Sequence, residues 1–148
     1  MASPCVKKID ERFAVYFDWK QATISHTIPD FPKIMKLGTK GMIEEIRQEL
    51  MAGPVDEEKA ATLEAMILCL EGLTAYSRNL ANQASRDASA EKNPQRRDEL
   101  AKLAEICSQV VEYPARTLDE AVNATWITWV TLHHESTNAG LSLGRLDQ

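Results

Sequence analysis

The chain has 148 residues, and its 44% hydrophobic content suffices for one domain with a buried core. A net charge of −5 argues against a nucleic-acid-binding surface, which is normally basic, and no apolar run is long enough to span a membrane. The opening residues lack the apolar core of a signal peptide, and the 3 cysteines lack Cys-x-x-Cys spacing, so we expect a cytoplasmic protein with reduced thiols.

The first part of the chain predicts an irregular segment followed by two helices. Residues 1–30 show no helical periodicity, although the aromatic stretch 13–19 is compatible with a short strand. Asp30 is expected to cap a short helix that Gly38 ends, and a second helix should run from after Gly41 to about residue 51.

The longest predicted helix begins after Asp56, which is a good N-cap residue. Apolar or small residues then recur at steps of three and four, which predicts one packing face over about six turns. They are Leu63, Met66, Leu70, Leu73, Ser77, Leu80 and Ala84. The charged stretch 86–98 is expected to be a solvated connection.

Two more helices are predicted downstream. Asn93 followed by proline is a start signal for the first of them, which should end before Pro114. Its expected buried face is Leu100, Leu103, Ala104, Cys107 and Val110.

Thr117 and Glu120 have the spacing of a capping box and open the last helix. Its expected apolar face is Leu118, Ala121, Val122, Thr125, Trp126, Trp129, Val130 and His133. The organisation predicted from the residues is therefore mainly α: an irregular segment 1–30, a helical region 31–134 and a loop 135–148.

The loop contains the most promising binding residue. Gly140 and Gly144 allow backbone conformations that other residues avoid, and Arg145 follows directly. A guanidinium in such a place can hold a carboxylate, phosphate or sulfonate with two parallel hydrogen bonds; the alternative is an ion pair between helices.

Other candidate residues favour structural roles. His133 and His134 are adjacent, so they point about 100° apart on a helix and are poor joint metal ligands. Cys69 and Cys107 fall at apolar positions of helices, which favours packed thiols over nucleophiles. No metal site and no catalytic residue is predicted.

Several blocks of this sequence resemble the glycyl radical enzyme family, which includes pyruvate formate-lyase and the diol dehydratases. The resemblance covers residues 24–148 and rests on motifs in matching order and spacing. They are Ser25-His26-Thr27-Ile28-Pro29-Asp30, Gly38-Thr39-Lys40-Gly41, Pro94 to Leu100 with Cys107 and Pro114, Asp119-Glu120-Ala121, and Glu135 followed by Ser142-Leu143-Gly144-Arg145-Leu146-Asp147-Gln148.

The resemblance implies substrate-binding roles for Arg145 and Asp147. Pyruvate formate-lyase has an arginine near its substrate's carboxylate at the position that Arg145 matches. Dehydratases and amine-lyases use the aspartate that Asp147 matches near polar substrate groups. Those enzymes tend to carry His or Tyr where this chain has Ala139, and this departure favours an anionic carboxylate or sulfonate substrate over a polyol.

The resemblance also implies an incomplete enzyme. The sequence lacks an Arg-Val-x-Gly motif, which holds the radical in the family, and lacks the central cysteine loop. We therefore expect an N-terminal or internal piece, itself non-catalytic and binding no cofactor, that forms the helical portion of an α/β barrel: four to five helices and a glycine-containing loop.

In the full-length enzyme, thiyl-initiated chemistry would cleave or form a carbon–carbon or carbon–heteroatom bond of a small molecule under anaerobic conditions. The implied partners are the remainder of the chain, a second copy in a homodimer and a radical S-adenosylmethionine activase, which installs the glycyl radical. The alternatives are a free-standing helical interaction module, a dehydratase-type member of the family and, last, a small metal-dependent enzyme that uses the histidine pair.

Overall fold

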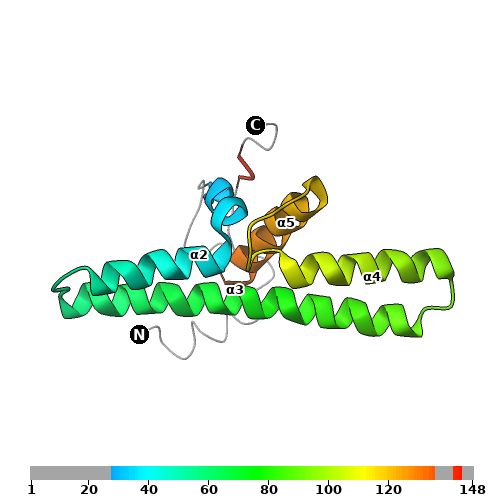
Figure 1. Cartoon of the computed structure of the whole chain (residues 1–148), viewed down its shortest axis with the longest axis horizontal. Coiled ribbons are helices and arrows are strands. Elements are labelled where there is room, and N and C mark those ends of the chain that lie inside the picture. Colours follow the sequence, from blue (N-terminus) through cyan, green and yellow to red (C-terminus); the bar gives the residue numbers. More distant parts are fainter. Residues whose placement is uncertain (1–27, 136–141, 145–148) are drawn as a thin grey trace, which may run out of the picture. The chain divides into compact units, whose positions relative to one another are not determined.

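The computed structural model describes residues 28–135 and 142–144. The described residues form four helices, α2 (Phe31–Met51), α3 (Glu57–Ala90), α4 (Pro94–Gln109) and α5 (Leu118–Glu135) (Figure 1). The prediction of a mainly helical chain is therefore confirmed for this part, whereas the possible strand at 13–19 lies outside it. The chain divides into two compact units, one of residues Asp30–Thr131 and one that joins Met1–Pro29 with Leu132–Gln148.

All four described helices begin directly after the cap residues that the sequence predicted, with Thr117 in that place for α5. The side chains of Asp30, Asp56 and Asn93 each accept a hydrogen bond from the backbone N–H three positions later, at 3.1, 2.8 and 3.3 Å. Such bonds satisfy backbone donors that have no partner within the helix.

The long helix α3 is the base on which α2 and α4 pack, one along each half (Figure 1). Its buried side is made largely of small residues, which let the neighbouring helix backbones approach closely. The buried residues are Leu63, Leu73, Ser77, Ala81, Ala84 and Ala88. The predicted packing face is thus correct except at Met66, whose side chain is exposed.

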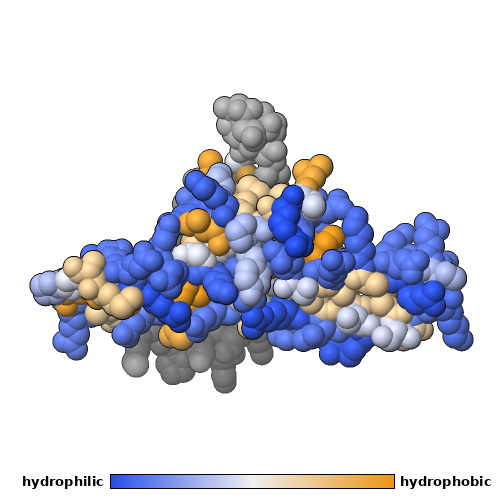
Figure 2. Space-filling model, in the orientation of Figure 1, coloured by the Kyte–Doolittle hydropathy of each residue, from blue (hydrophilic) through white to orange (hydrophobic). Residues whose placement is uncertain are grey.

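The prediction of a solvated connection over 86–98 is wrong. Helix α3 continues to Ala90, α4 begins at Pro94, and the connection between them is short. Ala88 extends the buried face of α3, while the charged side chains of this stretch take the solvent side of the helices (Figure 2).

A sharp kink divides α2 at Gly38, whose φ of +65° lies in the left-handed region. Here the chain comes very close to the segment after α4: a Cβ at Gly38 would lie 2.3 Å from the backbone oxygen of Glu112. The helix resumes immediately, so Gly41 lies inside it and not before its start as predicted.

The orientation of α5 differs from the prediction. The expected apolar face includes Leu118, Val122 and Trp126, yet these three side chains are exposed. The buried side contains Glu120, Ala124, Thr125, Ile127 and Thr128. Of these, only Thr125 belongs to the predicted face. Which side of a helix is buried depends on what it packs against, and apolar spacing within the helix does not fix that.

Candidate functional site

The loop after α5 is described at Ser142–Gly144, directly before the predicted binding residues. Gly144 has a φ of +71°, and its backbone N–H donates to the Ser142 hydroxyl oxygen at 3.2 Å. The prediction that a glycine serves an unusual backbone conformation is confirmed at Gly144. Arg145 and Asp147, the predicted substrate-binding residues, lie outside the described residues, as do Ala139 and Gly140.

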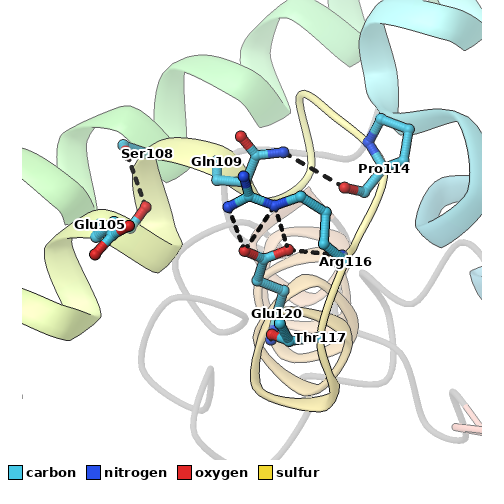
Figure 3. A network of polar contacts seen from close by, with 7 residues as sticks. All are labelled: Glu105, Ser108, Gln109, Pro114, Arg116, Thr117 and Glu120. Carbon is cyan, nitrogen blue, oxygen red and sulfur yellow. Dashed lines mark hydrogen bonds and ion pairs between the residues drawn. The ribbon is translucent and has the colours of Figure 1, made fainter.

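The start of α5 is held by a compact polar network (Figure 3). The Thr117 hydroxyl accepts a hydrogen bond from the Glu120 N–H at 3.2 Å, as a capping box requires. The Glu120 carboxylate in turn accepts from the backbone N–H of Arg116 at 2.6 Å, so hydroxyl and carboxylate both satisfy free backbone N–H groups, as predicted.

Glu120 is also paired with the Arg116 side chain. The guanidinium donates to both carboxylate oxygens, with the shortest contact at 2.6 Å. These side-chain and backbone hydrogen bonds hold the pKa of Glu120 below its ordinary value. Since the Glu120 side chain is buried, its ionised form depends on Arg116.

The segment between α4 and α5 is hydrogen-bonded to α2 and α3. We call the place where Val110–Glu112 of this segment meets these two helices the junction. The Thr39 and Lys40 N–H groups donate to the carbonyls of Val111 and Glu112, at 2.6 and 3.2 Å. The Ser77 hydroxyl of α3 donates to the carbonyl of Val110 at 3.4 Å and, at 2.8 Å, to that of Cys107 in the last turn of α4.

Further hydrogen bonds at the junction reach residues that follow Glu112. The Ala115 N–H donates to the carbonyl of Met35 in α2 at 2.9 Å, and the Gln109 side chain donates to the Pro114 carbonyl at 3.4 Å (Figure 3). The Thr39 and Thr74 hydroxyls are 2.6 Å apart. The junction therefore fixes where the chain enters α5.

A groove of about 780 Å³ lies beside the junction and is lined by residues of α2, α3 and the segment after α4. Arg78 of α3 pairs with Glu112 at 2.6 Å. Arg47 lies 3.9 Å from Glu71, and the Lys40 ammonium lies 5.1 Å from the centre of the Tyr113 ring. Because each of these cations has a partner within the groove, the groove is not a prepared anion site.

Among the described residues, the cysteines and histidines form no group that could hold a metal ion. Cys107 is buried, and burial raises the pKa of its thiol, which makes it an inert packing residue as predicted. Cys69 is exposed, so its predicted packing role is wrong. No group of three or more His, Cys, Asp and Glu side chains gathers anywhere in the described ranges, which include His133 and His134.

The aromatic pair of α5 is stacked, with the ring centres of Trp126 and Trp129 5.3 Å apart and their planes at 22°. Trp126 is exposed, so the prediction that this pair is part of the core is wrong for that residue. No helix within the described ranges is long and apolar enough to cross a membrane.

The described residues define a helical scaffold, followed in the chain by Ser142–Gly144 with a positive φ at Gly144. The model of the family described as Pyruvate formate lyase-like matches residues 4–148. The chain therefore belongs to the pyruvate formate lyase-like family, as its motifs predicted.

Curated relatives place these residues in much longer proteins. The chain is 39% identical over 128 residues to an isethionate sulfite-lyase of Oleidesulfovibrio alaskensis, a match that covers 82% of this chain and 15% of that protein. A (2S)-3-sulfopropanediol dehydratase of Klebsiella oxytoca is 29% identical over 131 residues, with 86% of this chain and 16% of that protein covered.

Among solved structures, a glycyl radical enzyme from Archaeoglobus fulgidus matches with a TM-score of 0.78 and 27% identity. The match covers 95% of this chain and 20% of that one. The helical arrangement described above is thus similar to part of a glycyl radical enzyme.

Proposed function

We propose that this chain is part of a glycyl radical enzyme that releases sulfite from a small sulfonate, and that it supplies helical scaffold and one wall of the substrate pocket. The observation that carries the proposal is the family match over residues 4–148 together with 39% identity to an isethionate sulfite-lyase. The name of the Klebsiella relative also refers to a sulfonate. Substrates with a sulfonate group agree with the anionic substrate expected from Arg145.

The proposed role of Arg145 is to hold the sulfonate. Its planar guanidinium can donate two parallel hydrogen bonds to two sulfonate oxygens, which a lysine cannot do. Gly144 precedes it with a φ of +71°, a conformation that gives the backbone a turn just before the arginine. Asp147 would accept a hydrogen bond from a hydroxyl of the same substrate.

The scaffold's role is to hold this loop in place before reaction begins. Catalytic groups must be kept within a fraction of an ångström by elements that are themselves packed. The junction and the Arg116–Glu120 pair fix the start of α5, the helix that precedes the loop in the chain.

The radical itself would come from another part of the enzyme. The 148 residues contain no Arg-Val-x-Gly motif, so the glycine that an activase oxidises would lie outside them. When present, the glycyl radical supplies hydrogen-atom abstraction from substrate through a cysteine thiyl. A homodimer, an activase and an anaerobic cytoplasm are part of this proposal.

A chimera tests the proposal: residues 4–148 replace the matching part of the Oleidesulfovibrio alaskensis lyase, and sulfite release from isethionate is measured after anaerobic activation. Arg145→Lys should raise the KM for isethionate roughly ten- to hundredfold, because one charge-assisted hydrogen bond of about 1.5–3 kcal/mol is lost. The matched control is Arg97→Lys on the exposed side of α4, which should leave KM unchanged.

Two results would count against the role of Arg145. The first is an unchanged KM in the lysine variant. The second is a large fall in melting temperature with normal isethionate binding by the folded enzyme, which would make Arg145 a structural ion pair.

A dehydratase-type function is the second candidate, since the Klebsiella relative is named as a dehydratase. The product separates the two candidates. A sulfite-lyase releases sulfite and leaves the substrate without its sulfonate, whereas a dehydratase releases water and keeps the carbon–sulfur bond. Mass analysis of the product of the activated chimera with (2S)-3-sulfopropanediol and with isethionate decides between them.

A further inference from the structure

Three large apolar side chains form a continuous stripe on α5, which we call the outer face. Leu118, Val122 and Trp126 are 78%, 58% and 57% exposed. They follow one another at steps of four residues, so they lie along one side of the helix. The Trp129 ring stacks on Trp126 and widens the stripe.

This outer face is unusual for a surface helix. The opposite side of α5 is already buried and contains Ala124 and Ile127. That packed side also contains the polar residues Glu120, Thr125 and Thr128, so the largest apolar side chains of α5 lie on its exposed side. A contiguous apolar patch on a protein surface marks an interaction site. By contrast, Leu68 on α3 is 67% exposed but stands alone, with Glu64, Glu71 and Gly72 one turn away, and single residues of this kind are common.

We infer that the outer face of α5 is an internal interface, covered in the complete enzyme by an apolar segment from outside residues 1–148. This inference rests on the proposed function, in which the chain is part of a longer protein. The relatives provide the room for such a segment, because this chain matches only 15% of the lyase and 16% of the dehydratase.

A second copy of this chain fits the outer face less well. A stable complex buries about 800 Å² on each partner, and even a fully covered tryptophan contributes only about 150–250 Å². Leu118, Val122 and Trp126 together fall short of that area. A covering segment that belongs to the same folded enzyme does not need so large a buried area, because other contacts within the enzyme already hold the segment in place.

The test compares the isolated chain with the chimera described above. Val122→Cys, made with Cys69→Ser to remove the exposed native thiol, is a small change at the centre of the outer face. A maleimide reagent should label this position rapidly in the isolated chain. In the chimera, labelling should be slower by roughly tenfold or more, because reaction then waits for local opening. Peptide mass spectrometry locates the label.

A second variant measures the energetic effect. The triple change Leu118→Ser, Val122→Ser and Trp126→Ser should leave the isolated chain folded and helical, with only a modest fall in melting temperature from the lost Trp126–Trp129 stacking, because most of each side chain is exposed there. In the chimera it should lower the yield of soluble folded protein by roughly tenfold, as for loss of core residues. The matched control Leu68→Ser should affect neither protein.

Three results would overturn the inference. The first is an equal rate of labelling of Val122→Cys in the isolated chain and in the chimera. The second is unfolding of the isolated chain when the triple change is made. The third is protection of Val122→Cys only when the isolated chain forms a concentration-dependent dimer. The test is independent of the reaction. A chimera that protects Val122→Cys but releases no sulfite would refute the proposed function and leave the interface standing, and an active chimera with free labelling would do the reverse.

Discussion

Replacing Gly38 with alanine is the sharpest test of the junction. Gly38 combines a φ of +65° with a ψ of 171°, a region of backbone space that essentially only glycine occupies. Its position also leaves no room for a side chain. An added Cβ would lie 2.3 Å from the Glu112 oxygen, 2.6 Å from the Glu112 carbonyl carbon and 2.8 Å from the Tyr113 Cα.

The expected loss of stability has two sources. A non-glycine residue in this conformation costs about 1–3 kcal/mol. The atoms that would clash belong to the backbone, so they must move, and the hydrogen bonds from the Thr39 and Lys40 N–H groups, each of about 0.5–1.5 kcal/mol, would weaken. The total of about 2–5 kcal/mol is a large part of the 5–15 kcal/mol that typically separates folded from unfolded domains.

Urea unfolding followed by helical circular dichroism measures the change in the free energy of unfolding. Gly72→Ala is the matched control, because nothing lies within 4 Å of its Cβ position and it sits inside α3. That control should be stabilised by about 0.5–1 kcal/mol, since alanine is the better helix former. If the free energy of unfolding of Gly38→Ala lies within about 0.5 kcal/mol of that of the original chain, the backbone of Gly38 does not approach Glu112 as closely as described.

Three further predictions concern the buried polar groups and the thiols. Arg116 lowers the pKa of Glu120 in the folded state, so the pair's contribution to the free energy of unfolding is fully present above the ordinary pKa of 4.5 and is lost as the pH falls through the lower folded pKa. Urea unfolding at several pH values should show this loss of stability in the original chain and much less of it in Glu120→Gln. Ser77→Ala should cost about 1–2 kcal/mol because its buried hydroxyl bonds the Cys107 carbonyl, whereas Thr62→Ala on the exposed side of α3 should change stability by less than about 0.5 kcal/mol. A thiol reagent should modify Cys69 in the native chain and Cys107 only after unfolding; equal native rates would contradict the burial of Cys107.

Features that depend on local chemistry could be predicted from the amino-acid sequence. The start of a helix requires an oxygen acceptor near free N–H groups, and Asp30, Asp56 and Asn93 supply it within three residues. The buried face of α3 follows from the helical period, and family membership follows from motifs that can be read directly along the chain. Local patterns also indicated a glycine in an unusual conformation before Arg145, which Gly144 shows.

Features that depend on partners distant along the chain became visible in the folded structure and could not be predicted from the sequence. Gly38 could be predicted to end a helix, but its approach to Glu112 involves a segment more than seventy residues away. The exposure of Trp126 could not be predicted either, because both sides of α5 have apolar residues and periodicity does not tell which one is covered. Helical period is a property of neighbouring residues, whereas burial depends on the shapes of the elements that meet, and that is settled only when they pack.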